Sequence, residues 1–92
     1  MSNYLIYVTT KDKAEARHIG RHLVQSRLVA CVNIFDHMNS MYIWKDEFQD
    51  DQEAVLIAKT TEARLPELIA AVRSMHSYEC PCIVSLPISH GH

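Results

Sequence analysis

The sequence contains few of the residues that interrupt or loosen a packed chain, with two glycines and three prolines in 92 residues. Gly20 and Gly91 each stand alone, so neither can build a glycine-rich loop that cradles phosphates. No internal repeat, low-complexity tract or linker-like stretch is present. Hydrophobic residues make up 48% of the chain, as in packed globular proteins. At this length we expect a single domain over residues 1–92.

The chain has no excess of basic residues. Nine Lys and Arg residues stand against eleven Asp and Glu residues, for a formal net charge of −2. Without a basic run that could neutralise several phosphates, we expect no nucleic-acid partner. The N-terminus has no basic region and only a short apolar stretch, so it predicts neither a signal peptide nor a membrane span. We therefore expect a cytoplasmic protein without a membrane partner.

Catalytic motifs are also missing. The sequence has no nucleophile elbow, no His-Glu-x-x-His and no paired carboxylates in an apolar frame, so we expect a protein that is not an enzyme. The three cysteines, Cys31, Cys80 and Cys82, are an odd number that suits a disulfide framework poorly. In a reducing compartment they would persist as thiols, available for metals.

The first half of the chain reads as a strand, a helix and a very long strand. Residues 4–9 are β-branched and aromatic with both faces apolar, which is typical of a buried strand. Asp12 and Glu15 can form a capping box for a helix that should run to about residue 28. Residues 30–44 predict one long strand, bent or bulged at the polar interruption in its middle.

The second half completes a symmetrical pattern. A polar cluster at residues 45–51 should separate the long strand from another at 53–59, forming a long hairpin. Apolar residues at helical spacing predict a second helix from about residue 65, with Pro66 in its first turn, to residues 74–76. Residues 82–88 form the last strand.

The resulting βαββαβ order predicts an α+β, ferredoxin-like fold, in which two helices cover one face of a four-stranded antiparallel sheet. The other face stays open. Because the strands are apolar on both sides, a monomer would expose a large hydrophobic surface, and we expect a partner subunit to cover it.

Five short segments together resemble the CutA family, the divalent-cation tolerance proteins, in order and spacing over nearly the whole chain. They are Ala-Cys-Val-Asn-Ile at 30–34, Ser-Met-Tyr-Ile-Trp at 40–44, Lys-Thr at 59–60, His-Ser-Tyr-Glu-Cys-Pro at 76–81 and Leu-Pro-Ile at 86–88. The resemblance implies a ferredoxin-like protomer and a tight homotrimer in which the long hairpins pair with neighbouring subunits. It also implies a role in tolerance to copper and other divalent cations.

The chain departs from the family pattern in several places. Residues 35–37, Phe-Asp-His, stand where relatives usually have a Pro-Gly pair that bends the long strand. Ser77 replaces a proline, Cys82 replaces a carboxylate, and Val8 stands where some relatives have a cysteine implicated in copper binding. The chain stops at His92, whereas relatives continue into a Tyr-Leu-x-Trp-like segment, so we expect a short C-terminal segment.

The predicted metal ligands are His76, Cys80, Cys82 and Cys31, for copper or another divalent cation. His76 matches the family's histidine associated with copper, although a histidine at a helix end can instead bond the last carbonyls. Cys80 and Cys82 flank Pro81, so in an extended segment their sulfurs can point to one side and attract Cu(I). The alternative is that they pack as small hydrophobes, as Cys31 does still more readily within an apolar strand.

Other residues receive simpler interpretations. His18 and His22 lie at i, i+4 on a solvated helix face and are not placed in the site, while Tyr42 and Trp44 are assigned to the trimer interface. A second hypothesis is a regulatory or scaffold trimer of the architecture of the nitrogen-regulatory PII proteins, binding a small molecule or an unidentified protein partner. The chain lacks the Gly-rich or Lys/Arg-rich loops of a phosphate-binding cleft, so the metal hypothesis leads.

Overall fold

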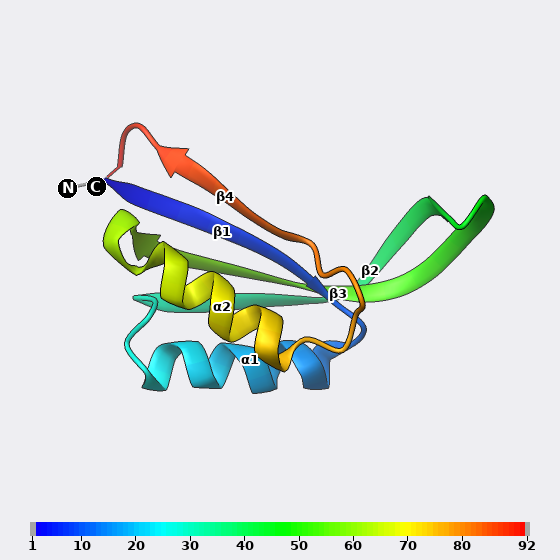
Figure 1. Cartoon of the computed structure of the whole chain (residues 1–92), viewed down its shortest axis with the longest axis horizontal. Helices are drawn as coiled ribbons and strands as arrows, with labels where there is room; N and C mark the ends of the chain where they lie inside the picture. The colour runs from blue at the N-terminus through cyan, green and yellow to red at the C-terminus, as the bar shows by residue number, and fades with distance from the viewer. Residues whose placement is uncertain (1, 92) are drawn as a thin grey trace.

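The computed structural model describes residues 2–91 and has four strands, two α-helices and one short 3-10 helix. Their order is β1 (Asn3–Thr10), α1 (Lys13–Gln25), β2 (Cys31–Trp44), β3 (Glu47–Thr61), η1 (Glu62–Arg64), α2 (Leu65–Met75) and β4 (Ile83–Ile88). The strands form one antiparallel sheet in the order β2-β3-β1-β4. Figure 1 shows α1 and α2 on the same side of this sheet. The predicted ferredoxin-like βαββαβ fold is therefore confirmed.

The helix side of the sheet, here the closed face, holds the hydrophobic core. Every second residue of the central strands points into it, and seven large aliphatic side chains have no exposed surface: Ile6, Val8, Ile19, Leu23, Leu56, Leu68 and Val72. Gly20 allows α1 to lie close to the sheet, because a Cβ atom at this position would stand 3.0 Å from Cγ1 of Val32. No helix among residues 2–91 is long and apolar enough to cross a membrane.

Several predicted boundaries differ from the structure. The hairpin turn is only Lys45 and Asp46, with φ of 50° and 65°, and not the whole of 45–51. Two left-handed residues make the tight turn whose twist matches paired strands, and the polar residues after it continue β3 as an exposed ladder against β2. Helix α1 ends at Gln25 and not near residue 28, because Arg27 turns the chain with a φ of 58°. Strand β4 begins at Ile83 and not at 82.

The predicted irregularity in the long strand is confirmed, and it changes which side chains face outward. Phe35 lies opposite Val55 and Met38 lies opposite Glu53, so Asp36 and His37 form a bulge without partners in the ladder. Since 53 and 55 share one face of β3, residues 35 and 38 both point to the sheet's uncovered side, here the open face. The even-numbered residues after the bulge therefore take over that face.

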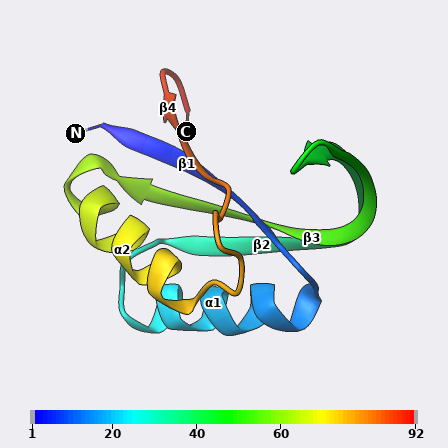
Figure 2. The same cartoon turned by 45° about the vertical axis from the view of Figure 1, so that its right-hand side comes forward.

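The bulge also marks the base of the hairpin arm, which we define as residues 38–53. Figure 2 shows the arm curving toward the side of the sheet opposite the helices. Its even-numbered residues on β2, including Tyr42 and Trp44, share a face with Asp51 and Glu53 of β3. This curvature brings the arm back toward the end of β1.

Candidate metal site

His76, the first predicted ligand, caps the C-terminal end of α2, and its side chain is completely buried. Nδ1 accepts a hydrogen bond from the Tyr78 backbone N–H at 3.1 Å. Nε2 therefore carries the proton and donates to the Thr9 carbonyl at 2.6 Å. The ring is thus hydrogen-bonded to β1 and to the loop that follows α2, and not to the last carbonyls of its own helix. A metal ion could reach it only by displacing one of these two partners.

Glu15 is the buried neighbour of this histidine, with Oε1 4.0 Å from Nδ1 of His76. Oε1 also accepts from the Lys11 N–H at 3.0 Å, and Oε2 accepts from the Ser77 N–H at 2.9 Å. Burial disfavours the charged form, but the hydrogen bonds from Ser77 and Lys11 outweigh it and lower the pKa of the Glu15 carboxyl. Half of the predicted capping box is present, since Asp12 Oδ1 accepts from the Glu15 N–H at 2.8 Å, while the Glu15 carboxylate bonds the N–H of Lys11 in place of that of Asp12. Glu15 therefore fastens the loop before α1 to the loop after α2.

Beside these loops the open face carries a cavity of about 530 Å³, here the open-face cavity. It lies between the end of β1, the hairpin arm and the loop that leads into β4. Among residues 2–91, its lining contains two thiols, two carboxylates and three aromatic rings, and no Lys, Arg or His. The lining residues are Thr9, Tyr42, Trp44, Glu53, Ser77, Tyr78, Glu79, Cys80 and Cys82.

Two of the four predicted ligands, Cys80 and Cys82, line this cavity, and both are exposed free thiols. His76 lies buried behind it. Cys31 is elsewhere, because it pairs with Lys59 of β3 whereas Thr9 pairs with Val55, four residues and about 13 Å further along that strand. Among residues 2–91, no group of three or more His, Cys, Asp or Glu residues is arranged to hold a metal ion. A single chain therefore offers a pair of thiols and no complete set of four ligands.

Glu53 is the most buried acid of the cavity, with 8% of its surface exposed, and no motif in the sequence indicated it. Its Oε2 accepts a hydrogen bond from the Tyr78 hydroxyl at 2.5 Å. Burial and the adjacent carboxylate raise the pKa of Tyr78 far above its usual value, so Tyr78 stays protonated. Glu53 stands at the polar start of an apolar run, where a strand normally emerges into solvent. Nothing in that local pattern indicates burial, which comes from the loop after α2.

Tyr42 also has its hydroxyl fixed by an acid. It donates to Oδ2 of Asp51 at 2.5 Å, and this hydrogen bond raises the pKa of Tyr42 to about 12. The i, i+2 spacing of Tyr42 and Trp44 is the sequence signal that places both rings on one side of the strand. Two tyrosines with hydroxyls bound to carboxylates thus contribute to one cavity.

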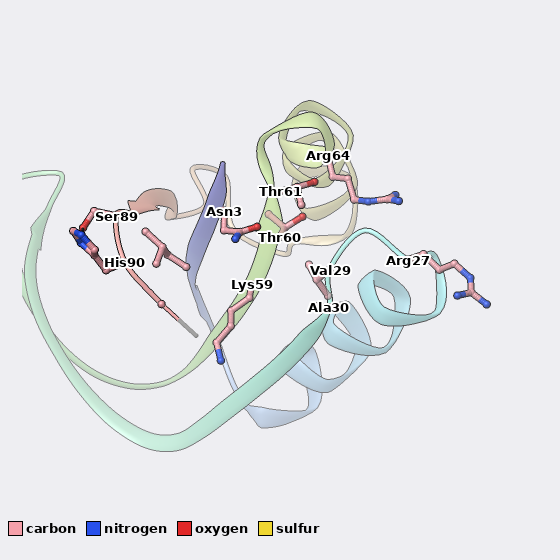
Figure 3. A pocket seen from close by; sticks show the side chains of 12 residues that line it. Asn3, Arg27, Val29, Ala30, Lys59, Thr60, Thr61, Arg64, Ser89 and His90 are labelled. Carbon is pink, nitrogen blue, oxygen red and sulfur yellow. The ribbon is translucent and has the colours of Figure 1, made fainter. Parts of the chain in front are cut away.

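A second hollow, of about 750 Å³, lies at the other end of the sheet, where β1 begins and β3 ends. Of the residues that the structure describes, Arg27, Lys59, Arg64 and His90 contribute to its lining, and no acidic side chain does. Figure 3 shows Arg27 and Arg64 extending to one side and Lys59 in another direction, so their charged ends do not converge over Thr60. A basic lining repels metal cations, which leaves the open-face cavity as the candidate metal site.

Known proteins are similar to this chain in sequence and in fold. The family model for the CutA1 divalent ion tolerance protein matches residues 4–92. The divalent-cation tolerance protein CutA of Thermus thermophilus is 41% identical over 88 residues, which are 96% of this chain and 85% of that protein. Human Protein CutA is 36% identical over 86 residues, 94% of this chain but 48% of that protein, so the chain spans only about half of this longer relative.

Solved structures agree with the sequence relatives. The divalent cation tolerance protein of Thermus thermophilus superposes with a TM-score of 0.94 at 40% identity, covering 98% of this chain and 87% of that one. The periplasmic divalent cation tolerance protein CutA of Archaeoglobus fulgidus gives a TM-score of 0.94 at 36% identity with the same coverage. Since the family match spans almost the whole sequence and the fold agrees, the chain belongs to the CutA1 divalent ion tolerance protein family.

Proposed function

We propose that this protein is a homotrimeric metal-binding protein that takes part in tolerance to copper and other divalent cations. Its family and the names of its relatives support the tolerance role. The observation that supports metal binding is the position of Cys80 and Cys82, two exposed thiols at a cavity that is lined, within residues 2–91, by carboxylates and by no cationic side chain. A cytoplasmic location remains a prediction, since one similar protein is described as periplasmic and another as chloroplastic.

The donor set favours a soft ion. Two thiolates suit Cu(I), and among residues 2–91 no third His, Cys, Asp or Glu is arranged with them to hold an ion. A divalent ion that prefers four ligands would need donors beyond those one chain provides. His76 remains a predicted ligand, but it can bind a metal only after giving up Thr9 or Tyr78. We therefore propose Cys80 and Cys82 as the primary ligands.

Surface composition supports self-assembly. On the open face Phe35, Val84 and Leu86 are 56%, 44% and 51% exposed. On the hairpin arm Met41, Ile43 and Phe48 are 64% to 66% exposed. Monomeric proteins rarely leave apolar surface of this extent in water. Three copies of the chain, each covering the next, are the occupants we propose, and the family resemblance implies the same number.

Titration of the reduced protein with Cu(I) and Cu(II) tests the metal proposal. We expect the Cys80→Ser/Cys82→Ser variant to lose at least about tenfold in Cu(I) affinity, because it removes both soft ligands. The matched control is Cys31→Ser, which removes a thiol outside the cavity and should leave the affinity unchanged. His76→Ala should weaken Cu(II) binding if the buried ring is released to the metal. Unchanged Cu(I) affinity in the double variant would contradict the proposed ligands.

Light scattering tests the assembly separately. A mass of three chains at micromolar concentration is the expected result, and it should persist in the cysteine variants because the thiols are not part of the apolar surface. A monodisperse monomer would contradict the trimer while leaving the metal proposal standing.

A further inference from the structure

We propose that His18 and His22, on the outer side of α1, form a second metal site that binds a borderline divalent ion, Ni(II) or Cu(II), through two imidazole rings. Water molecules complete the coordination of the ion. The site uses nitrogen donors on the helix side of the sheet and none of the cavity thiols. It therefore goes beyond the proposed function and does not depend on it.

The first argument is spacing. His18 and His22 stand at i and i+4 of α1, positions that are neighbours on one face of a helix, with Cβ atoms about 5–6 Å apart. Two histidines at this spacing can bind one ion together, as they do in zinc sites carried by a single helix. The three residues between them, Ile-Gly-Arg, include no glutamate that could act as a general base. The pair thus offers binding without hydrolytic chemistry.

The second argument is that α1 holds this spacing before any metal arrives. Asp12 caps its first turn by accepting from the Glu15 N–H at 2.8 Å. The inner side of the helix is fixed in the core by side chains with no exposed surface, Ala16, Ile19 and Leu23. A chelating pair on a helix that is already ordered loses little conformational freedom when it binds an ion.

The third argument is that both rings are available. His18 and His22 are exposed, and Nε2 of His22 lies 3.5 Å from Ser26 Oγ, which is long for a hydrogen bond. His76, by contrast, is buried and has hydrogen bonds at both ring nitrogens. A metal ion at α1 therefore displaces water and one weak contact, whereas at His76 it must break a strong hydrogen bond.

The proposed assembly also leaves this side of the chain uncovered. Figure 1 shows α1 on the helix side of the sheet, and Figure 2 shows the hairpin arm curving away from the helices. The apolar surface that needs a cover lies on the open face and the arm. The exposed residues of α1 are polar apart from Ala14 and Val24. A trimer built on the open face thus leaves the histidine pair in contact with water.

The fourth argument concerns which ion fits. Imidazole suits Cu(II), Ni(II) and Zn(II), whereas Mg²⁺ and Ca²⁺ need several oxygen ligands. Glu15, the acid of α1, adds no oxygen, since its two carboxylate oxygens accept from the N–H groups of Lys11 and Ser77. Arg21 lies three residues after His18 and is exposed, so its charge opposes a cation at this face. The affinity must therefore come from two rings that bind one ion.

The test is calorimetric titration with Ni(II) in the Cys80→Ser/Cys82→Ser protein, which lacks the cavity thiols. We expect His18→Gln and His22→Gln each to lower the Ni(II) affinity at least about tenfold, because a single ring loses the gain from joint binding. Losses below about threefold in both variants would overturn the proposal.

The matched control is His22→Gln/Gln25→His, which keeps the number of histidines and changes only their spacing. It moves the second ring to i+7, about 10 Å along the helix axis from His18 and out of reach of a shared ion. We expect this variant to bind Ni(II) as weakly as His22→Gln does. All of these positions are exposed, so circular dichroism without metal should be unchanged. An unchanged Ni(II) affinity would overturn the proposal and place the ion on other histidines.

A variant with the opposite sign adds a second check. Arg21→Gln removes a positive charge beside the pair and should raise the Ni(II) affinity about threefold at low ionic strength. An affinity that does not rise would count against an ion at this face.

The cysteine and histidine variants separate the two proposals. Cys80→Ser/Cys82→Ser should lose Cu(I) affinity and retain the Ni(II) site on α1. His18→Gln/His22→Gln in the protein with all its cysteines should lose Ni(II) affinity at that site and keep Cu(I) affinity within about twofold, since soft Cu(I) prefers the thiolates. Loss of Cu(I) affinity in this histidine variant would overturn the independence of the second site.

Discussion

The two faces of the sheet differ in how completely a single chain buries their apolar residues. On the closed face α1 and α2 cover the strands, and Ile6, Val8 and Leu56 have no exposed surface. On the open face Val84 and Leu86 are about half exposed, although they belong to the same sheet. The closed face is a core, whereas one chain leaves the apolar residues of the open face exposed. The thiols, the buried acid and the aromatic rings all gather on the unfinished side.

This difference follows from sequence patterning combined with one bulge. Strands that are apolar on both sides need two cover layers, and a chain with two helices supplies one. The bulge at Asp36 and His37 then determines which residues of the arm point to the uncovered side. Without it, the odd-numbered residues of the arm would face the cavity instead of Tyr42 and Trp44. Trp44 lines the cavity and its apolar neighbour Ile43 does not, because the two side chains point to opposite faces of the strand.

The largest expected effect on stability comes from truncating a leucine on the closed face, compared with the same substitution on the open face. Leu56→Ala should lower the free energy of unfolding by about 2–5 kcal/mol, because it leaves a cavity in a fully buried core. Leu86→Ala should cost less than about 1 kcal/mol in dilute protein, since half of that side chain is already exposed. Urea denaturation at low and high protein concentration measures both. The Leu86 effect should grow with concentration as copies assemble, and equal effects at every concentration would contradict the contrast.

Glu15 links the closed face to the loops that border the cavity, and its replacement should have the next largest effect. Glu15→Gln should cost about 2 kcal/mol at neutral pH, since backbone N–H groups of Lys11 and Ser77 lose a charged acceptor. Because folding lowers the pKa of Glu15, its contribution is present above the unfolded value and disappears as the pH falls through the folded value.

Denaturation of both proteins at several pH values checks this. The difference in unfolding free energy between wild type and Glu15→Gln should disappear in acid, below the unfolded pKa of about 4.5. Glu67→Gln, a change at an exposed position on α2, is the control and should stay within about 0.5 kcal/mol of wild type. A stability difference that does not change with pH would show that packing, and not charge, explains the role of Glu15.

Sequence periodicity predicted the closed face well, because core positions recur at fixed spacing. The βαββαβ order and the irregular long strand followed from that spacing, and so did the capping role of Asp12. The turn was predicted too long because Lys45 and Asp46 are not the Asn-Gly pair that usually indicates two left-handed residues. The end of α1 was missed for a similar reason, since Arg27 is an uncommon residue at positive φ.

The open-face cavity was harder to predict because it depends on contacts between distant segments. The spacing of Cys80 and Cys82 indicated that both sulfurs could point to one side, and both residues line the cavity. No local pattern brings Tyr78 to Glu53, which are 25 residues apart. Nor could any pattern show that the His76 ring is buried with both nitrogens bonded, since a histidine at a helix end is usually exposed. Prediction of a ligand set therefore requires the three-dimensional contacts, whereas the core can be predicted from the sequence pattern.

Gly20 offers a smaller test of how tightly the closed face is packed. Gly20→Ala improves helix propensity by about 1 kcal/mol, but the new methyl group would stand 3.0 Å from Cγ1 of Val32. We expect a net loss of about 1 kcal/mol in unfolding free energy. Val32→Ala should relieve the contact, so the double variant should be more stable than the sum of the single changes predicts. Additive effects would indicate that α1 can move away from β2 without cost.

The smallest effect is expected on the open face, at the hydrogen bond between Tyr42 and Asp51. Folding raises the pKa of Tyr42 from 10.0 to about 12 because its hydroxyl donates to the carboxylate. A raised pKa means that the stabilising contribution is present below the unfolded value and is lost as the pH rises through the folded one, so it should disappear between about pH 10 and 12. Asp51→Asn removes the charge and keeps the shape, and it should return the pKa of Tyr42 toward 10.0 without changing the fold. The phenolate absorbance of Tyr42 follows from the difference between each protein and its Tyr42→Phe counterpart. If Tyr42 titrates at the same pH in wild type and Asp51→Asn, the hydroxyl is not bound to Asp51 in solution. The Tyr42 ring at the open-face cavity is then less fixed than the core residues of the closed face.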